Sequence, residues 1–447
     1  MGFMSKAFFI NLGCVKNLVD SEYILGRIKE QGYDIVDDPL GADIAIVNTC
    51  AFIRPAVEES IDTILELARL KDKGHLTSVV VVGCFVQRYG RKLLREIPEV
   101  DGWVGTGQIH RIGEILSTKS ANTPIFFIDK PRFLADHKVP RAQTTPFYSA
   151  YLKIAEGCSH QCSYCIIPSL RGSSRSRTID SLFIETKNMV EKGVKEINLV
   201  AQDTTSYGHD LDPPWRFEDL LVKLLTISGL HWLRILYAHP YHLTEGILEL
   251  IDSEEILCPY LDVPIQHVNP DILRAMGRPL QAESIPQFVE KIRKRSRKIT
   301  LRTTVLIGFP GETEEQFKEL CNFIQEAKFE RLGVFAFSPE KGTRAARLKN
   351  SIPQSVVKDR VQELIEIQAD ISRNSNKELV GKTMPVIVEG LSPETDLLLT
   401  GRTARMAPDI DGQVLINEGT ATVGEIVPVH ITEAHTYDLV GGIEREG

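Results

Sequence analysis

Continuous apolar segments alternate with stretches of helical periodicity through most of this chain, and that alternation restricts its fold more than any other feature. In the first part of the chain the apolar segments are Ala7–Asn11 (AFFIN), Asp43–Asn48 (DIAIVN) and Val79–Gly83 (VVVVG), and the helical stretches are Asp20–Gln31 and Ala56–Lys71. A strand that is apolar on both sides must be covered on both faces, as in a parallel sheet between two layers of helices. We therefore predict an N-terminal parallel α/β domain over residues 1–137.

A linker, predicted at residues 138–148, separates this domain from a second α/β region. Its sequence from Val139 to Phe147 (VPRAQTTPF) is polar and contains two prolines. The strands predicted beyond it are Tyr151–Ala155, Glu196–Ala201, Trp232–Tyr237, Leu261–Gln266, Thr300–Ile307 and Gly333–Phe337. This series fits a partial barrel of the TIM type, (β/α)6, whose functional residues lie at the carboxyl ends of the strands. We predict the barrel over residues 149–378, with the helix Arg360–Asn374 leading out of it.

The last segment, residues 379–447, has short strands separated by glycine turns. Its apolar stretches are Pro385–Glu389, Asp396–Leu399 and Gln413–Ile416. This pattern predicts a small all-β barrel of five strands. The whole chain is therefore expected to be a multidomain α/β protein that ends in an all-β module.

The negative charge of the chain is concentrated in that C-terminal module. The chain has 52 basic and 60 acidic residues, a net charge of −8, and residues 381–447 contain eleven acidic and four basic residues, a net charge of −7. A module that follows nucleic-acid phosphates should carry the opposite sign. The charge favours a basic protein partner by electrostatic complementarity, and the alternative is a module that only maintains solubility.

No targeting or membrane segment is apparent. No apolar run approaches the roughly 20 residues of a membrane span, and the apolar stretch after Met1 is too short for a signal peptide. We therefore expect a cytoplasmic protein with no membrane partner.

Three of the eight cysteines form a compact motif directly after the first predicted barrel strand. Cys158, Cys162 and Cys165 have the spacing C-x3-C-x2-C. Three thiolates in one loop can ligate three irons of a 4Fe–4S cube and leave the fourth iron open to a small molecule. A zinc site would need a fourth ligand, and His160 is poorly placed for it between the cysteines. Three unligated thiols would fit badly with so polar a loop.

Three further cysteines each follow a predicted strand of the N-terminal domain. They are Cys14, Cys50 and Cys84. Because the carboxyl ends of parallel strands meet at one edge, where ligands bind, the three thiols are predicted to share a metal or cluster site. The alternative is three separate buried thiols, which is our prediction for Cys258 and Cys321.

The segment Tyr151–Arg171 (YLKIAEGCSHQCSYCIIPSLR) resembles the cluster loop of radical S-adenosylmethionine enzymes. The order of all the parts, over essentially the whole chain, resembles the methylthiotransferase family. The resemblance implies an enzyme that transfers a sulfur-containing group, with a C-terminal TRAM domain and two 4Fe–4S clusters. It implies that Cys158, Cys162 and Cys165 hold the cluster that chelates S-adenosylmethionine, and that Cys14, Cys50 and Cys84 hold the other.

Several segments resemble the branch of the family that modifies the β-carbon of an aspartyl residue in small-subunit ribosomal protein twelve. They are Leu12–Glu22 (LGCVKNLVDSE), Val200–Gly208 (VAQDTTSYG), Leu261–His267 (LDVPIQH), Phe337–Ala345 (FSPEKGTRA) and Ala407–Gly412 (APDIDG). Val15 departs from the proline usual in the first of these segments, and Glu340 stands where the tRNA-modifying branch tends to carry arginine. The resemblance implies that the substrate is this ribosomal protein, free or on the ribosome.

Two other functions remain open at this point. The first is a tRNA adenosine methylthiotransferase, which shares both cysteine sets. The second is a non-catalytic iron–sulfur or zinc protein, which would not cleave a cofactor and would give the barrel no function. With the ribosomal protein as substrate, we expect an electron donor and a sulfur donor as partners, no direct tRNA substrate, and a monomer.

Six residues are expected near S-adenosylmethionine, and none is assigned as catalytic. Gly308 and Gly311 belong to a stretch that resembles the segment of the family near the adenine, whereas Gln202 and Asp203 lie at a predicted strand end. Arg171 and Arg177 flank the cluster loop and can meet the carboxylate of the cofactor. A simple glycine turn and ordinary surface arginines are the alternatives.

Overall fold

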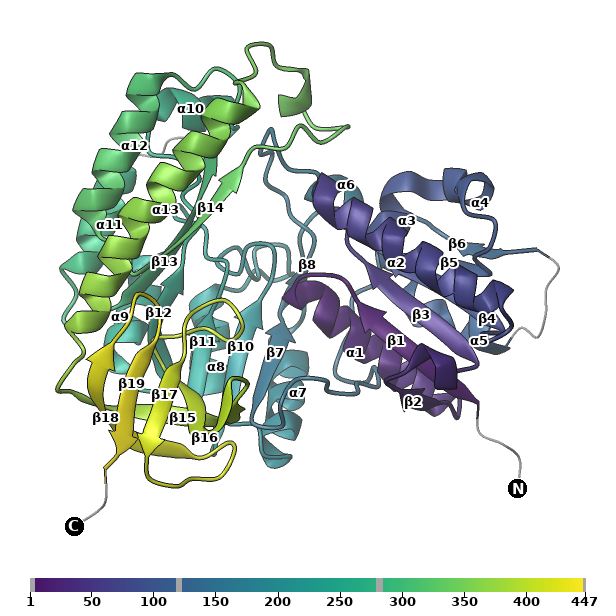
Figure 1. The fold of residues 1–447 in the computed structure, drawn as a ribbon, viewed down its shortest axis with the longest axis horizontal. Coiled ribbons are helices and arrows are strands. Elements are labelled where there is room, and N and C mark those ends of the chain that lie inside the picture. Colours follow the sequence, from purple (N-terminus) through teal and green to yellow (C-terminus); the bar gives the residue numbers. More distant parts are fainter. Residues whose placement is uncertain (1–4, 118–122, 279–283, 445–447) are drawn as a thin grey trace.

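The N-terminal lobe is a six-stranded parallel sheet between two layers of helices (Figure 1). The computed structural model describes residues 5–117, 123–278 and 284–444. The strands, in the sheet order β2-β1-β3-β4-β5-β6, are β2 (Asp34–Val36), β1 (Lys6–Asn11), β3 (Ile44–Thr49), β4 (Ser78–Gly83), β5 (Gly102–Gly105) and β6 (Ile125–Phe127). The helices of the lobe are α1 (Val15–Glu30), α2 (Arg54–Asp72), α3 (Cys84–Tyr89), α4 (Leu93–Glu96) and α5 (Ile112–Ser117). The predicted parallel α/β fold is confirmed.

Alternation of side chains along the strands explains why both helical layers form. On β4, Val80 and Val82 pack against α1 and α5, whereas Val79 and Val81 pack against α2 and α3. All four valines are fully buried, which is the environment that a wholly apolar parallel strand requires.

The central region is an open barrel of six parallel strands surrounded by helices. Its strands, in spatial order, are β7 (Ser149–Lys153), β10 (Glu196–Val200), β11 (Trp232–Ile235), β12 (Leu257–Asp262), β13 (Thr300–Ile307) and β14 (Arg331–Ala336). Its helices are α6 (Ile167–Arg171), α7 (Ile179–Glu191), α8 (Phe217–Leu225), α9 (Glu245–Ser253), α10 (Pro270–Ala275), α11 (Ile285–Arg293), α12 (Glu314–Ala327) and α13 (Gln354–Lys377), and β8 (Ala155–Glu156) pairs with β9 (Arg175–Ser176) beside it. The partial (β/α)6 barrel is confirmed.

The prediction for the fourth barrel strand was wrong by four residues. The strand was expected at Leu261–Gln266, but β12 spans Leu257–Asp262. The stretch is largely apolar, so periodicity does not locate the strand within it. Pro259 is also unusual inside a central strand, because it cannot donate a backbone hydrogen bond. The proline is accommodated because the pairing of β11 with β12 shifts register there. Residues 263–266 are thereby released to the edge of the barrel, where Pro264 and Gln266 line a cavity.

The C-terminal module is the predicted closed five-stranded barrel. Its strands are β15 (Thr383–Ser392), β16 (Thr395–Thr403), β17 (Val414–Glu418), β18 (Ile426–Ala434) and β19 (Leu439–Ile443). It packs against the central barrel through Arg402, which pairs with the buried carboxylate of Glu196 at 2.8 Å. Among the described residues, no helix has both the length and the apolar character needed to cross a membrane.

Candidate active site

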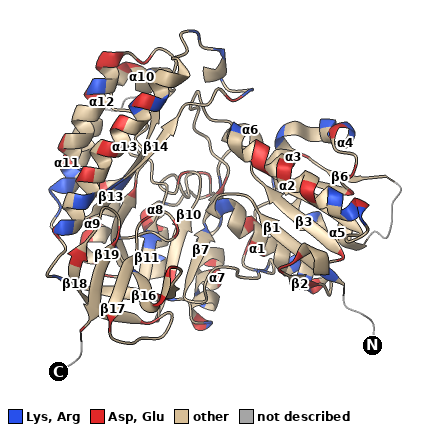
Figure 2. Ribbon diagram, in the orientation of Figure 1, with Lys and Arg blue, Asp and Glu red and all other residues tan. Residues whose placement is uncertain are grey.

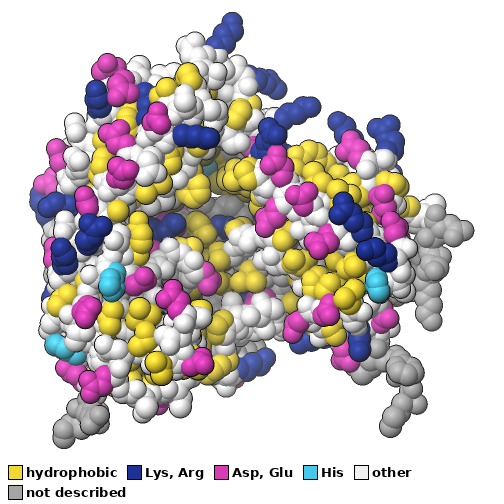
Figure 3. Space-filling view, in the orientation of Figure 1, with side chains coloured by type: hydrophobic (Ala, Val, Ile, Leu, Met, Phe, Trp, Pro, Cys, Tyr) yellow, Lys and Arg dark blue, Asp and Glu magenta, His cyan; other side chains and the backbone are white. Residues whose placement is uncertain are grey.

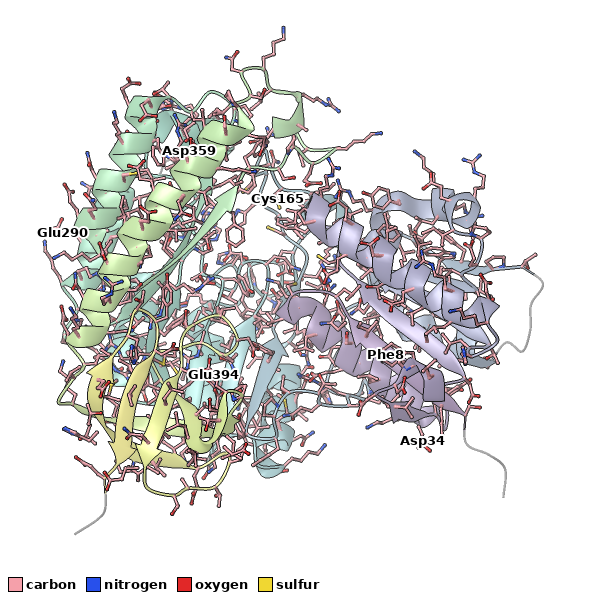
Figure 4. All side chains as sticks on the ribbon, in the orientation of Figure 1. Phe8, Asp34, Cys165, Glu290, Asp359 and Glu394 are labelled. Carbon is pink, nitrogen blue, oxygen red and sulfur yellow. The ribbon has the colours of Figure 1, made fainter. Side chains whose placement is uncertain are left out.

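All six cysteines of the two sets line one cavity of about 470 Å³ between the N-terminal lobe and the central barrel. Figure 3 shows the surface hollowed between these two parts, and Figure 4 shows Cys165 at their junction. Cys258 and Cys321 are buried elsewhere, as predicted for core residues. The fold therefore brings together two cysteine sets that are far apart in the sequence.

The N-terminal set follows three adjacent strands of the parallel sheet. Cys14 follows β1, Cys50 follows β3 directly, and Cys84 is the first residue of α3 after β4. Gly83, the last residue of β4, has a φ of 100°, and a Cβ there would lie 2.7 Å from the Thr49 carbonyl oxygen. Only glycine accepts this turn without displacement, so the turn that presents Cys84 depends on it.

The second set lies in a loop that the rest of the barrel holds in shape. Gly157 has a φ of 81°, and a Cβ there would lie 2.3 Å from the Ser173 carbonyl oxygen. The Ser163 N–H donates to the Met276 carbonyl at 2.7 Å, and its hydroxyl donates to the Ala275 carbonyl at 2.8 Å. These bonds fasten the cysteine loop to the end of α10.

Burial keeps most of these thiols protonated in the absence of a ligand. It raises the pKa of Cys84 and Cys165 to about 12 and that of Cys158 to about 11. Cys14 differs, because the Lys16 ammonium and the Arg171 guanidinium outweigh burial and lower its pKa. Since only thiolates ligate metals, binding of iron must displace protons from the buried thiols.

Among the described residues, neither cysteine set forms a site for a single metal ion. We considered the ligand atoms of histidine, cysteine and acidic side chains in the described residues. One group of three has all its ligand atoms within 4.8 Å of one another, and it consists of His160, His239 and His242. A Zn–S bond of about 2.3 Å sets the sulfur atoms of a zinc site about 3.8 Å apart. The sulfur atoms of neither cysteine set lie that close to one another. Two sets of three separated thiols suit a cube, which presents its irons at different corners.

The three histidines surround a buried carboxylate at one wall of the cavity. Asp203 accepts hydrogen bonds from His160 Nε2 at 2.7 Å and from His242 Nδ1 at 2.8 Å. The rings of His160 and His239 are stacked, with centroids 4.4 Å apart, so their nitrogen lone pairs do not converge on one point. The histidines thus hold Asp203 in place, and hydrogen bonds from His160 and His242 outweigh burial and lower its pKa.

Arg171 lies beside the N-terminal cysteine set and is not a surface residue. Its guanidinium pairs with Asp20 and Glu156, both at 2.9 Å, and its Nη2 lies 3.6 Å from Cys84 Sγ. Gln202 also lines the cavity, and its Oε1 has no hydrogen-bond partner among the described residues. Of the six residues expected near the cofactor, Arg171, Gln202 and Asp203 line the cavity.

The other three predicted residues do not line the cavity. Arg177 is buried on the far side of the cysteine loop, where its guanidinium is paired with Glu185. Gly308 has a φ of 78° and a Cβ there would lie 2.5 Å from a Val357 methyl, so it is needed for packing against α13. Gly311 has a φ of 92° and open space beside it. The surface alternative is wrong for both arginines, which are each 3% exposed.

Several cavity residues were not predicted from the sequence. Lys16 and Asn17 follow Cys14 in the first turn of α1, and this position beside a cysteine was a signal that could have identified them. Tyr237 and Gln266 have left-handed φ values of 59° and 70°, which side-chain patterns do not reveal. Arg278 reaches the cavity from the end of α10.

Three family models match consecutive parts of the chain. Residues 6–105 match a family described as "Uncharacterized protein family UPF0004", residues 152–324 match the radical SAM superfamily, and residues 380–443 match the TRAM domain. These matches correspond to the N-terminal lobe, the central barrel and the C-terminal module.

Solved structures with a similar fold are radical S-adenosylmethionine enzymes. The methyltransferase TsrM from Kitasatospora setae, with cobalamin and a [4Fe-4S] cluster bound, has a TM-score of 0.55 at 15% identity over 77% of this chain and 74% of its own. The cobalamin-dependent enzyme OxsB has a TM-score of 0.50 at 12% identity over 81% of this chain and 56% of its own. At this level of identity they show the fold alone.

Curated relatives match the chain over nearly its full length. The "Ribosomal protein uS12 methylthiotransferase RimO" of Geobacter sulfurreducens is 48% identical over 98% of both chains. The RimO proteins of Geotalea uraniireducens and Myxococcus xanthus are each 46% identical, over 98% of this chain and 98% and 91% of theirs. With both cysteine sets in place around one cavity, the chain belongs to the RimO family of radical S-adenosylmethionine methylthiotransferases.

Proposed function

We propose that this protein attaches a methylthio group to the β-carbon of an aspartyl residue in ribosomal protein uS12, the small-subunit protein twelve. The observation that carries the proposal is that both cysteine sets line one cavity. A sulfur source and a radical source must reach the same carbon atom, and one cavity of about 470 Å³ satisfies that requirement. The RimO names of the full-length relatives support the choice of substrate.

The target C–H bond excludes ordinary acid–base catalysis. No side-chain base can usefully deprotonate an unactivated β-carbon near neutral pH, so a cofactor must supply the chemistry. When bound, two 4Fe–4S clusters and two molecules of S-adenosylmethionine supply a radical that removes the hydrogen, together with the sulfur and methyl groups.

The residues of the chain bind and orient these groups. We infer that Cys158, Cys162 and Cys165 hold the cluster that binds S-adenosylmethionine, and that Cys14, Cys50 and Cys84 hold the second. The Gln202 acceptor has no partner among the described residues, and Asp203 is held by two histidines, so both present fixed oxygens near the loop of Cys158, Cys162 and Cys165. Arg171 supplies positive charge beside Cys14 and Cys84.

The C-terminal module favours a basic protein over RNA. Seven of its acidic residues are exposed, whereas Lys382 is the one exposed Lys or Arg among its described residues. Figure 2 marks the positions of acidic residues along the ribbon of this module. Such a surface attracts a basic ribosomal protein and repels the phosphates of tRNA, which is why we place the tRNA adenosine reaction second.

The remaining parts of the proposal follow from the substrate and the chemistry. The reaction requires an electron donor and a sulfur donor, and a substrate on the ribosome places the enzyme in the cytoplasm. We propose that it acts as a monomer, because one chain supplies all six cysteines that line the cavity.

Iron content and cofactor cleavage test the assignment of the two sets. Anaerobically reconstituted protein should bind about eight irons, four for each set. Replacing Cys158, Cys162 and Cys165 by alanine should halve the iron and abolish cleavage of S-adenosylmethionine. Replacing Cys14, Cys50 and Cys84 should also halve the iron, but should leave cleavage measurable while methylthiolation is lost. Four irons in the intact protein, or zinc in place of iron, would contradict the proposal.

A further inference from the structure

Lys16, on the wall of the cavity, is a cation that has no carboxylate partner among the described residues. Its ammonium lies 3.3 Å from the centroid of the Tyr237 ring, and no carboxylate of the described residues forms an ion pair with it. Placing an ammonium away from bulk water is costly unless an opposite charge compensates it. A ligand that brings a negative charge to this position would supply that compensation.

Two parts of the molecule hold Lys16 and Tyr237 together. Lys16 belongs to the first turn of α1 in the N-terminal lobe, and Tyr237 follows β11 of the barrel. Tyr237 adopts a left-handed φ of 59°, which is uncommon for a bulky residue. Its N–H donates to Asp262 Oδ2 at 3.2 Å, which helps to fix this conformation. Strained backbone of this kind is concentrated at functional sites.

The other cations of the cavity are engaged or lie elsewhere. Arg171 is already paired with Asp20 and Glu156. Arg278 has no carboxylate partner among the residues that the structure describes, but it donates to Tyr164 Oη at 3.5 Å and to the Pro264 carbonyl at 2.9 Å. Because Tyr164 lies between Cys162 and Cys165, Arg278 belongs to the side of the cavity where S-adenosylmethionine would bind.

Two carboxylates must therefore enter a cavity in which Lys16 and Arg278 have no carboxylate partner from the described parts of the chain. One belongs to S-adenosylmethionine and the other, on the proposed function, to the target aspartyl side chain. The aspartyl carboxylate is bonded directly to the β-carbon that receives the sulfur. It must therefore lie on the side of Cys14, Cys50 and Cys84, and Lys16 is only two residues from Cys14.

We propose that Lys16 binds the side-chain carboxylate of the target aspartyl residue and so places its β-carbon beside the N-terminal cysteine set. This inference rests on the proposed function and adds the residue that distinguishes aspartate from its neutral analogue. A charge-assisted hydrogen bond from the ammonium gives both affinity and orientation. The exposed rings of Phe52 and Phe335, one from each part, line the same cavity.

A binding cycle with two forms of uS12 tests the proposal without relying on turnover. Binding of the reconstituted protein to labelled uS12 is measured by fluorescence anisotropy, with aspartate or asparagine at the target position. We expect the wild-type protein to bind the aspartate form about 10- to 100-fold more tightly than the asparagine form. In Lys16→Met that ratio should fall to about one, whereas Lys16→Arg should retain part of it.

The controls separate this role from a general defect. Lys223→Met removes another ammonium that faces an aromatic ring, that of Phe183 at 4.6 Å, but on the exposed side of α8. This variant should keep the wild-type ratio. Wild type and Lys16→Met should bind the asparagine form equally, which shows that the variant is folded.

Two results would overturn the inference in different ways. If Lys16→Met keeps the wild-type preference for aspartate, Lys16 does not bind the carboxylate, and the proposed function is untouched. If the wild-type protein binds neither form of uS12, the proposed function fails and the inference fails with it.

Discussion

At the scale of single residues, glycines determine where the cavity cysteines are placed. Gly83 precedes Cys84 and Gly157 precedes Cys158, and both glycines have left-handed φ values. The space beside each is closed by a backbone carbonyl, of Thr49 and of Ser173 respectively. A side chain at either position would shift the cysteine that follows.

Gly83→Ala should selectively damage the N-terminal cysteine set. The new methyl group would meet the Thr49 carbonyl, so Cys84 should move and about half of the iron should be lost. Cleavage of S-adenosylmethionine should remain. Gly74→Ala is the matched control, because Gly74 has a similar φ of 78° but nothing within 4 Å. It should cost about 1–2 kcal/mol of stability and leave the iron unchanged. Full iron content in Gly83→Ala would contradict this account.

Part of the site was predictable from the sequence, because cysteine chemistry is distinctive and because strand ends can be located. The positions of Cys14, Cys50 and Cys84 after three strands were sufficient to expect a shared site. The contacts of Arg171 were not predictable, since its partner Asp20 lies 151 residues earlier in the chain. The ring of Tyr237 reaches Lys16 through a backbone conformation that has no signature in the sequence.

At the scale of secondary structure, one buried carboxylate joins the C-terminal module to the central barrel. Glu196, at the start of β10, accepts from Arg234 of β11 at 2.9 Å and from Arg402 of β16 at 2.8 Å. Both arginines and the glutamate are almost completely inaccessible to solvent. The sequence predicted both barrels correctly from their strand patterns, but it contained no signal for the residues that connect them.

Acidification should weaken this connection. Burial would raise the pKa of Glu196, but Arg402 and Arg234 outweigh it and lower the pKa to about 2. Because the folded pKa is below the unfolded value, the stabilisation is complete above about pH 4.5 and is lost as the pH falls towards 2, by about 3 kcal/mol in total. The midpoint of thermal unfolding should fall across this range.

A charge-neutral variant isolates the contribution of Glu196. Glu196→Gln should lower stability at pH 7 by about 3–5 kcal/mol, since two buried guanidinium groups lose their partner. It should also show a shallower loss of stability below pH 4.5. Glu58→Gln, which alters an exposed pair with Arg54, should keep the wild-type slope. An equal slope in Glu196→Gln would show that this group does not control the acid response.

At the scale of the whole molecule, the cavity exists only because the N-terminal lobe and the barrel are held together. Arg88 of α3 pairs with Glu340 at 2.8 Å, and both side chains are 8% exposed. Arg141, between β6 and β7, pairs with Glu22 of α1 and Glu185 of α7. Glu340 stands where the tRNA-modifying branch tends to carry arginine, and its carboxylate joins the two parts by pairing with Arg88 and accepting from the Arg54 N–H at 3.0 Å.

The acidic C-terminal module should contribute to capture of uS12 at a distance from the cavity. Neutralising the exposed pair Glu394 and Asp396, as Gln and Asn, should weaken binding to uS12 and reduce its dependence on salt concentration. Neutralising Glu59 and Glu66 on α2 changes the net charge equally and should have a smaller effect. Equal effects of the two variants would indicate a response to net charge alone.

The most direct test of the whole account is a competition between the two candidate substrates. The reconstituted protein is incubated anaerobically with S-adenosylmethionine, a reductant, purified uS12 and bulk tRNA, and both macromolecules are then analysed by mass spectrometry. The account predicts one methylthio group on an aspartyl residue of uS12, no change in the tRNA, and loss of the product when either cysteine set is replaced. Methylthiolated tRNA beside unmodified uS12 would contradict it.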